Sequence, residues 1–470
     1  MLGFSLRQLC KSFKVETLKS FFPFLLTDLN YKGEFPSIEL YSKIDKSDYD
    51  QVKSDWEKTN QDEWSFKEQS IKYCYIDCIA LFEILVKFNE LIFNQFKINI
   101  HSSLTLPSLA MNIFKSLFMP ENTLYQLLGK PERDIREAYT GGAVDVYQTN
   151  NSINWNPFSW IKRTLYYYDV NSLYPYIMAT LAVPVGKPIA FEGDIRKVDP
   201  SAQGFFYCEI KTPDNDFYPI LQRKIKTLQG IRTIAGLGTW TGWISSYELD
   251  NAAKRGYEFK IIRGYKFRTQ VIFDKYVNTM YNLRLKYSKD DPMNFVAKLL
   301  LNSLYGKFGM KTETTQVTMY DTKDIHDRKV LKFTIKDLRE SIQDIFYIDN
   351  FVVILEKDVI RFKYNEKEDL YHGLDVNIAI AATITAGGRI HMSQFKPSGW
   401  LNKFLFYTDT DSLICSEKLP SRLVGNQLGQ MKLEHIIKDG VFLAPKVYGF
   451  ITSFAFFIYI INKKKKIIKK

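Results

Sequence analysis

The chain has 470 residues, of which 46% are hydrophobic and 25% are charged, so it can bury a large core and we expect about two to four domains. No apolar run approaches the roughly 18 residues that a membrane-spanning helix needs, and the first residues lack the pattern of a secretory signal, so we expect no membrane partner. The formal net charge of +12 favours a polyanionic partner, but six of these charges are lysines in the last eight residues. Because a basic tail is often only a solvated end, charge alone leaves nucleic-acid binding open.

Five cysteines are scattered along the chain: Cys10, Cys74, Cys78, Cys208 and Cys415. No second Cys or His pair stands at zinc spacing. We therefore interpret them as reduced thiols in a core and not as a disulfide framework or a metal site.

The first part of the chain, residues 1 to about 135, is typical of a mixed α/β structure. An amphipathic segment at residues 6–18 is followed by a polar stretch at 43–61. The apolar spacing beyond it predicts a helix from Ser65 to about Phe96.

Prolines and a glycine at residues 120–131 indicate a boundary. Two adjacent glycines follow in Tyr139-Thr-Gly-Gly, where the backbone can adopt conformations that other residues resist. The next apolar segment predicts a strand over Leu165–Val170.

A helical hairpin is predicted between Asp274 and Gly306. Its first helix should end near Lys289, and Asp291-Pro292 offers an N-cap followed by proline at the first helical position. A further helix is predicted over 378–395, and residues 404–415 indicate two strands joined by a tight acidic turn.

Acidic residues stand at two predicted strand ends: Asp169 after the first strand, and Asp409 with Asp411 in the acidic turn. Phosphoryl transfer requires charge neutralisation, which two magnesium ions about 3.5–4 Å apart can provide, and these ions prefer carboxylate oxygens. If the strands are neighbours, the three carboxylates can converge. Taken alone, an Asp-x-Asp segment is more often a plain hairpin turn.

The second helix of the hairpin carries Lys298, Asn302 and Tyr305 at a spacing that places them on one face. The lysine can bind phosphate and the tyrosine can pack on a base or a sugar, although a solvated lysine on an amphipathic helix would have the same pattern. Lys286, on the preceding helix, could reach the same triphosphate.

Taken together and in this order, the segments resemble the conserved motifs of family B DNA polymerases. The matching segments are Tyr139-x-Gly-Gly, Asp169-x-x-Ser-Leu-Tyr-Pro, Lys298-x-x-x-Asn-Ser-x-Tyr-Gly306, Tyr407-x-Asp-Thr-Asp-Ser and Lys446-Val-Tyr448. They resemble the linker motif, motifs A, B and C, and the primer-binding motif. A reverse-transcriptase-like palm is disfavoured, because a threonine separates the carboxylates of motif C and motif B has the family B form.

The resemblance implies an α/β (α+β) right-hand fold with a palm and helical fingers. It also implies a DNA-directed DNA polymerase that uses a DNA template, a primer and dNTPs. The implied cofactors are two Mg²⁺ ions, with Mn²⁺ as a possible substitute. Asp169 and Asp411 would be the principal metal ligands, assisted by the Val170 carbonyl, with Asp409 as a nearby acidic partner. The implied nucleotide-binding residues are Tyr174, Lys286, Lys298, Asn302 and Tyr305, with Tyr174 excluding a 2′-hydroxyl. The implied DNA contacts are Tyr139, Gly141, Gly142, Ser303, Gly306, Thr410, Lys446 and Tyr448.

Further segments resemble the protein-primed branch of the family. Ser5-Leu6-x-x-Leu9 and Lys19-x-x-Phe22 are similar to two of its short motifs, and Tyr73-x-x-x-Asp77 to the third exonuclease motif of linear plasmid polymerases. This likeness implies replication of a linear plasmid or organellar DNA primed by a terminal protein. It also implies residence in the mitochondrion, in agreement with the abundance of residues that AT-rich codons specify.

The resemblance divides the chain into seven parts. Residues 1–135 would be a partial, RNase H-like exonuclease domain, 136–192 the linker motif and the palm with motif A, and 193–270 palm and a first insertion. Residues 271–310 would be the fingers, 311–375 a second insertion, 376–450 the palm with motif C, and 451–470 an atypical lysine-rich tail.

The sequence departs from the family pattern at both ends. The first two acidic exonuclease motifs are missing, so Tyr73 and Asp77 would be a remnant and we expect no competent 3′–5′ exonuclease. Only 22 residues follow Tyr448, where the family has a thumb, so we expect weak DNA retention. The alternative to an active polymerase is a catalytically impaired relic that binds nucleic acid without turnover.

Overall fold

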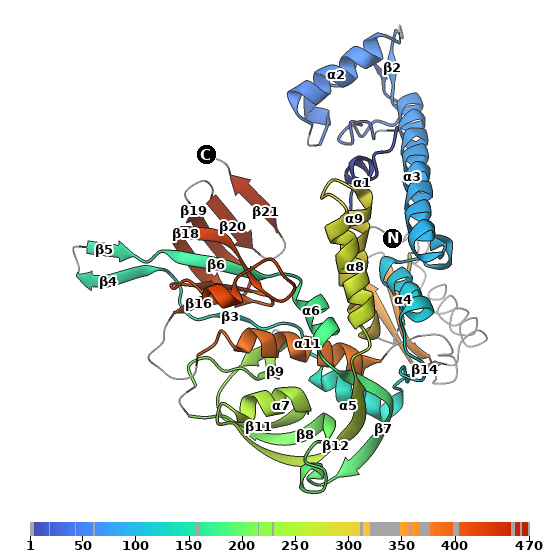
Figure 1. The fold of residues 1–470 in the computed structure, drawn as a ribbon. Helices are drawn as coiled ribbons and strands as arrows, with labels where there is room; N and C mark the ends of the chain where they lie inside the picture. Colours follow the sequence, from blue (N-terminus) through green and yellow to red (C-terminus); the bar gives the residue numbers. More distant parts are fainter. Residues whose placement is uncertain are drawn as a thin grey trace. The chain divides into compact units, whose positions relative to one another are not determined.

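The structure is a computed structural model that describes residues 4–470 except for 18, 43, 60–61, 157–158, 215, 228–229, 311–313, 320–347, 357–358, 367–376, 398–403, 453–455, 461–462 and 469–470. The chain forms two compact units, one of residues 1–118 with 278–303 and the other of 119–277 with 304–470. Figure 1 shows the ribbon. Among the described residues, no helix is both long enough and apolar enough to cross a membrane.

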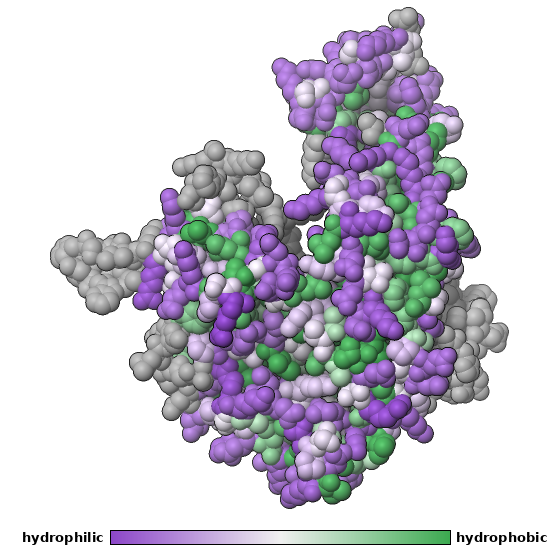
Figure 2. Space-filling view, viewed as in Figure 1, coloured by the Kyte–Doolittle hydropathy of each residue, from purple (hydrophilic) through white to green (hydrophobic). Residues whose placement is uncertain are grey.

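The first unit is built around the long helix α3 (Phe66–Phe96), whose N-cap Ser65 accepts a hydrogen bond from the Glu68 backbone and which ends at Lys97 in the left-handed conformation. Buried residues recur at every fourth position over its second half: Ala80, Ile84, Phe88, Ile92 and Phe96. On its exposed side, hydrophobic residues are interspersed with hydrophilic ones, as Figure 2 shows. The unit therefore packs along one stripe of α3.

The remaining elements of the first unit are short. They are α1 (Leu6–Phe13), β1 (Lys32–Gly33), η1 (Ile38–Leu40), α2 (Lys46–Glu57), β2 (Trp64–Ser65), η2 (Ile100–Ser102) and α4 (Leu106–Leu117). Most of α8 (Asp274–Lys286) and α9 (Pro292–Phe308) also belongs to this unit. Phe13 of α1 packs edge-on against Phe88 of α3 and against Phe295 of α9, with ring centroids 5.9 and 6.4 Å apart.

The second unit contains an eight-stranded antiparallel sheet in the order β21-β20-β19-β18-β6-β17-β16-β3. The strands are β3 (Val144–Val146), β6 (Leu165–Val170), β16 (Leu405–Asp409), β17 (Ser412–Cys415), β18 (Met431–Ala444), β19 (Val447–Thr452), β20 (Phe456–Ile460) and β21 (Lys463–Ile468). Strand β6, from the first half of the chain, lies between β17 and β18 from its end. Helices α6 (Leu173–Thr180) and α11 (Ile378–Ser393) pack against each other in the same unit.

A smaller sheet in the second unit has the strand order β11-β8-β12-β7. It comprises β7 (Val183–Glu192), β8 (Gln203–Lys211), β11 (Thr239–Ser245) and β12 (Glu258–Gln270), with α7 (Ser246–Ala253) packed on it. Strand β9 (Gln222–Thr227), which forms a hairpin with β10 (Gly230–Ala235), lines a cavity together with β11. Its core contains Phe206, Cys208, Ile244, Leu249 and Ala252. The other elements are α5 (Gly129–Ala138), η3 (Ile195–Lys197), η6 (Ser421–Leu423), the pair β4 (Ser152–Asn156) and β5 (Ser159–Lys162), and the three-stranded sheet of β13 (Thr314–Met319), β14 (Ile348–Glu356) and β15 (Val359–Glu366).

Most predicted elements are confirmed at or near their expected bounds. The strand over Leu165–Val170 and the start of the second hairpin helix at Pro292 agree, whereas the first hairpin helix ends at Lys286 and not near Lys289. Helix α11 stops at Ser393, two residues before the predicted end. The polar stretch at 43–61 contains a helix, α2, that the apolar pattern does not predict, because none of its residues is buried.

The interpretation of the five cysteines is wrong for two of them. All five are free, and Cys10, Cys208 and Cys415 are buried as expected. Cys74 and Cys78 are exposed on α3, because they lie outside its buried stripe.

Candidate active site

The strands that carry Asp169 and Asp411 are direct neighbours in the large sheet. Ser412 on β17 pairs with Asp169 on β6, and the Val170 backbone N–H donates a hydrogen bond to the Asp411 carbonyl oxygen at 2.7 Å. The end of β6 and the acidic turn before β17 therefore lie side by side. The sequence-based condition that the two strands be neighbours is met.

The acidic turn between β16 and β17 is tight. The Asp411 N–H donates to the Asp409 carbonyl oxygen at 2.6 Å across Thr410, whose φ is 54°. A non-glycine residue in this left-handed region costs energy, and such strain is found where the surrounding structure fixes the backbone. The fixing contact here is a hydrogen bond of 2.9 Å from the Thr410 N–H to the Ala143 carbonyl oxygen.

The second glycine of Tyr139-Thr-Gly-Gly, Gly142, lies against this turn. A Cβ atom added to Gly142 would lie 2.7 Å from the Thr410 Cα, whereas one added to Gly141 would meet nothing within 4 Å. Only a glycine at position 142 permits this approach. The linker motif and motif C, predicted as separate DNA contacts, therefore touch each other.

Two carboxylates influence the same tyrosine. The pKa of Tyr167 on β6 is raised by burial, and the charges of Asp169 and Asp411 raise it further. The pKa of Asp411 is itself raised, first by burial and then by the charge of Asp409, while its own backbone hydrogen bond and Lys446 oppose the shift. Since the site disfavours a bare anion at Asp411, a cation would relieve it.

The donor set fits a hard divalent ion. Mg²⁺ is commonly held by one or two carboxylates together with substrate phosphates and water, and seldom by an all-protein cage. Asp169, Asp411 and the backbone at Val170 offer that kind of set. Within the described part of the chain, no group of three or more His, Cys, Asp or Glu side chains is placed to hold a metal ion.

Asp409 is engaged by Lys446, which was predicted to hold the primer. The Lys446 ammonium lies 2.9 and 2.8 Å from the two Asp409 carboxylate oxygens, and its backbone N–H donates to the Tyr407 hydroxyl at 2.8 Å. The Tyr448 ring packs against Tyr407, with centroids 4.9 Å apart. The Lys-x-Tyr segment therefore supports motif C directly, and its contact with DNA stays a prediction.

Tyr174 and Tyr305 form a pair of rings whose centroids are 4.5 Å apart. Burial raises the pKa of both hydroxyls, and the charge of Asp411 contributes to each shift. The helix α11 comes close to Tyr174 because residue 388 is glycine: an added Cβ would lie 3.2 Å from the Tyr174 ring. These two predicted nucleotide-binding residues therefore lie in the electrostatic neighbourhood of Asp411.

The other predicted residues of the helical hairpin belong mainly to the first unit. Lys298 and Asn302 are exposed on α9, and Lys286 is the last residue of α8. The Ser303 hydroxyl donates to the Leu299 carbonyl oxygen of its own helix. The nucleotide roles of the first three and the DNA contacts of Ser303 and Gly306 stay predictions.

Sequence reasoning missed a buried ion pair behind the linker motif. Arg389 of α11 donates to both carboxylate oxygens of Glu248 on α7, each at 2.8 Å, and to the carbonyl oxygens of Thr140 and Gly141 at 2.7 and 2.9 Å. Its side chain is 3% exposed, so the pair is almost fully desolvated. An arginine inside an otherwise apolar helix was the available signal, although its partner lies 141 positions away.

The predicted exonuclease remnant forms a local cluster in the first unit. The Lys19 ammonium lies 2.5 Å from an Asp77 carboxylate oxygen and 4.7 Å from the Tyr73 ring centroid. Although burial lowers the pKa of Lys19, hydrogen bonds to Asp77 and Tyr73 raise it overall. Lys19 thus neutralises the acidic residue of this segment.

Comparison with known proteins supports the predicted resemblance to DNA polymerases. The family described as DNA polymerase type B, organellar and viral, matches residues 1–398. A probable DNA polymerase of Ascobolus immersus is 34% identical over 464 residues, which cover 96% of this chain and 36% of that protein. A probable DNA polymerase of Neurospora intermedia is 31% identical over 465 residues, which cover 95% of this chain and 45% of that protein. The chain thus spans less than half the length of these relatives.

Solved structures show the same fold. The phi29 DNA polymerase complexed with primer-template DNA superposes with a TM-score of 0.58 at 21% identity, covering 99% of this chain and 68% of that chain. Its ternary complex with primer-template DNA and incoming nucleotides gives a TM-score of 0.59 at 20% identity, covering 100% and 70%. The predicted mixed α/β polymerase fold is confirmed.

Proposed function

The chain belongs to the family of organellar and viral type B DNA polymerases, and on this premise we propose that it extends a primer strand on a DNA template with deoxynucleoside triphosphates. The observation that carries the proposal is the pairing of β6 with β17, which brings the strand end at Asp169 beside the turn at Asp411. In this proposal the large antiparallel sheet is the palm and the α8–α9 hairpin is the fingers.

Asp169 and Asp411, with the Val170 carbonyl, would hold divalent metal, which we propose to be Mg²⁺ or, as a substitute, Mn²⁺. When bound, such ions neutralise the triphosphate and activate the attacking hydroxyl. Asp409 forms an ion pair with Lys446. It would act on the site through its electrostatic field and not as a direct metal ligand.

The tyrosine pair would form the floor for the incoming nucleotide. Tyr174 is held between Tyr305 and the close-packed Gly388, so its ring has little freedom to move. A rigid ring beneath the sugar would exclude a 2′-hydroxyl by contact, and Lys286, Lys298 and Asn302 would bind the triphosphate and the base. Holding the reacting groups in a fixed geometry can lower a barrier by several kcal/mol, roughly 7–11 in well-oriented systems.

We further propose that replication is primed by a terminal protein and takes place in the mitochondrion, on a linear plasmid or organellar DNA. The similarity of the Ser5-Leu6-x-x-Leu9 and Lys19-x-x-Phe22 segments to motifs of the protein-primed branch supports priming, and the organellar description of the family supports the location.

Primer extension tests the polymerase proposal. The purified chain should extend a primed template in Mg²⁺, and Asp169→Asn or Asp411→Asn should lower the rate by roughly 10³-fold, since a metal site supplies several kcal/mol of charge stabilisation. Asp214→Asn, at an exposed position in the same unit, is the matched control and should leave the rate unchanged. Salt-dependent DNA binding without any extension would instead support the catalytically impaired alternative.

A further inference from the structure

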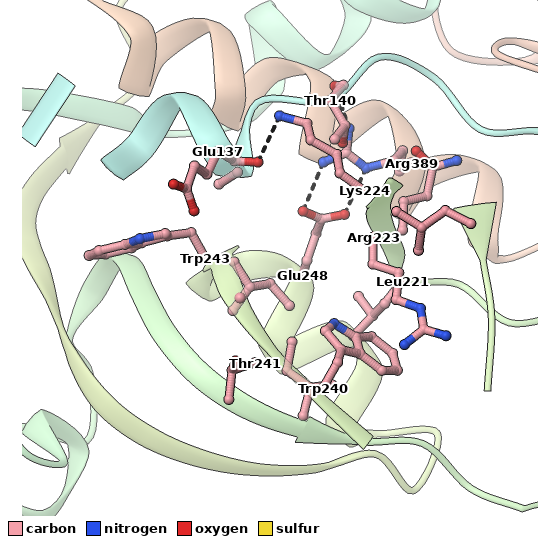
Figure 3. Close-up of a pocket in the computed structure, with 16 residues that line it drawn as sticks. Glu137, Thr140, Leu221, Arg223, Lys224, Trp240, Thr241, Trp243, Glu248 and Arg389 are labelled. Carbon is pink, nitrogen blue, oxygen red and sulfur yellow. Dashed lines mark hydrogen bonds and ion pairs between the residues drawn. The ribbon is translucent and has the colours of Figure 1, made fainter. Parts of the chain in front are cut away.

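A cavity of about 340 Å³ adjoins the linker motif at Thr140 (Figure 3). Its wall is formed by the end of α5 and Thr140, by strands β9 and β11, and by Glu248 and Arg389. Sites for small molecules in proteins are typically roughly 300–1,000 Å³. This cavity is at the small end of that range, so it can admit one nucleotide-sized group and not a duplex.

The cavity carries an excess of positive charge. Lys224 on β9 donates to the carbonyl oxygens of Arg136 and Glu137 at the end of α5, at 3.3 and 3.0 Å. Its pKa is lowered, first by burial and further by the charges of Arg136 and Arg389, while Glu137 opposes the shift. Two nearby cations thus already disfavour the charged lysine, and an anion bound here would relieve that repulsion.

Arg223 adds a second cation next to an aromatic ring. Its guanidinium carbon lies 5.0 Å from the Trp240 ring centroid, and Figure 3 shows the two side chains side by side on the cavity wall. Its Nε is buried, with no hydrogen-bond partner among the described residues. Trp240 is half-buried and packs partly on the core of the smaller sheet, whereas Trp243 is stacked with Tyr265, with ring centroids 5.4 Å apart.

The negative side chains of the wall do not cancel this charge. Both oxygens of Glu248 are taken by Arg389, so this acid balances only that arginine. Glu137 and Lys224 are both exposed, so solvent screens the charge of each, and the Arg223 guanidinium with its buried Nε is left without an acidic partner among the described residues of this wall. The combination left over is a pair of cations beside an indole ring, which suits a planar group that carries a phosphate.

We propose that this cavity binds one nucleotide unit, with its phosphate at Arg223 and Lys224 and its base against Trp240, separately from the site at Asp169 and Asp411. The unit can be a free mononucleotide or one nucleotide of a single strand. Arg389 bonds to the Thr140 and Gly141 carbonyls, and Gly142 touches Thr410, so the occupied cavity lies one segment away from the acidic turn. The proposal goes beyond the polymerase function and does not depend on it.

Binding is tested with the full chain in EDTA, with dAMP and a single-stranded (dT)10 as probes, by calorimetry. Saturable binding is expected, weakened at least about tenfold by Trp240→Ala, which removes the base stack, and by Arg223→Gln, which removes a charged hydrogen-bond donor to the phosphate. Lys226→Gln is the matched control: this exposed lysine lies two residues beyond Lys224 on β9, outside the cavity, and the variant should bind normally. Parallel weakening of (dT)10 assigns a strand as the source, whereas weakening of dAMP alone assigns a free nucleotide.

Three results would overturn the proposal. The first is an equal loss of binding in Lys226→Gln, which would indicate a general basic surface. The second is competition by inorganic phosphate or by a glutamate-rich peptide as strong as that of dAMP. The third is loss of dAMP binding in the Asp169→Asn, Asp411→Asn double variant. The last variant separates this site from the polymerase site. Should Trp240→Ala fail to fold, Arg223→Gln still tests the binding of dAMP. Photocrosslinking of the unchanged chain to a (5-iodo-dU) decamer tests the strand, because crosslinks that avoid the peptide containing Trp240 contradict a strand in this cavity.

Discussion

The Lys446 ammonium binds both carboxylate oxygens of Asp409, at 2.9 and 2.8 Å, from the turn between β18 and β19. The lysine side chain is 42% exposed and that of Asp409 only 16%, so the pair reaches from solvent into the site. Because such a pair is partly screened, we expect a double-mutant coupling of about 0.5–1 kcal/mol in thermal or urea unfolding.

This pair makes the first prediction, which concerns activity. If Lys446 serves mainly to neutralise Asp409, the Lys446→Met and Asp409→Asn losses in primer extension should be non-additive, and the double variant should be no worse than the poorer single one. Lys446→Arg, which keeps the charge, is the control and should retain most activity. Additive losses, with the Lys446→Met effect confined to the KM for primer, would show instead that the lysine acts on DNA independently of Asp409.

The second prediction concerns the stability of the metal-free protein. Burial, followed by the charge of Asp409, raises the pKa of Asp411 in the folded state. Ionising this carboxyl group therefore requires more free energy in the folded protein than in the unfolded chain. Above the folded pKa, Asp411→Asn should therefore increase the free energy of unfolding in EDTA, by about 1 kcal/mol, the scale of single stabilising substitutions. The gain should disappear as the pH falls below the ordinary aspartate pKa, where both states are protonated.

Adding Mg²⁺ provides the internal control for this stability change. A ligand that binds only the folded state stabilises it by mass action, so Mg²⁺ should raise the melting temperature of the unchanged protein more than that of Asp411→Asn. An Asp411→Asn variant that is less stable in EDTA at neutral pH would contradict the electrostatic account of this site.

The third prediction compares two adjacent glycines. An alanine at position 142 would bring its Cβ to 2.6–2.7 Å from Thr410, including its backbone Cα, whereas one at position 141 has open space. Gly142→Ala should displace the acidic turn and lower primer extension by roughly tenfold to a hundredfold, since small misplacements of reacting groups have large effects. Gly141→Ala should remain within about twofold. Equal activities for the two variants would mean that the turn accommodates the added methyl group.

Local patterns predicted much of this fold because they are set by residues close in sequence. The cap at Ser65 and the fourfold apolar spacing beyond it fix α3, and Asp291-Pro292 fixes the start of α9. The strand over Leu165–Val170 follows from its run of aromatic and apolar residues. Helix α2 was missed because it buries none of its residues and depends on its cap at Asp45.

The rest depends on contacts between residues far apart in the chain, which a single sequence does not specify. Arg389 forms an ion pair with Glu248, which is 141 positions away in the sequence. Lys446 forms one with Asp409, at a separation of 37 positions. The motif pattern identified Lys446 as functional, yet only the hairpin of β18 and β19 shows that it lies on Asp409. Likewise, the cavity at Trp240 combines residues from six helices and strands with Thr140 of the linker motif, and only the folded chain brings them together.

The fourth prediction uses the two glycines of α11 to separate nucleotide selection from packing. A Cβ on Gly388 would lie 3.2 Å from the Tyr174 ring and 3.4 Å from the Leu173 side chain. The Tyr174 ring would therefore have to move by a few tenths of an ångström to admit it. Alanine also favours the helix by about 1 kcal/mol over glycine, which offsets the crowding. Gly388→Ala should therefore keep its stability while the displaced Tyr174 raises the KM for dNTPs and weakens discrimination against ribonucleotides.

Its neighbour provides the matched control. A Cβ on Gly387 would come within 2.5 Å of Ile177 and 2.8 Å of Leu181, on the packed interface with α6 and away from Tyr174. Overpacking of this kind destabilises proteins by roughly 1–3 kcal/mol, so Gly387→Ala should lower the unfolding free energy and leave sugar discrimination intact. Single-nucleotide incorporation of dNTPs and rNTPs, measured beside urea unfolding for both variants, tests this separation. Since only one of the two glycines faces the tyrosine, a shared loss of discrimination would show that the effect passes through the whole helix and not through the Gly388–Tyr174 contact.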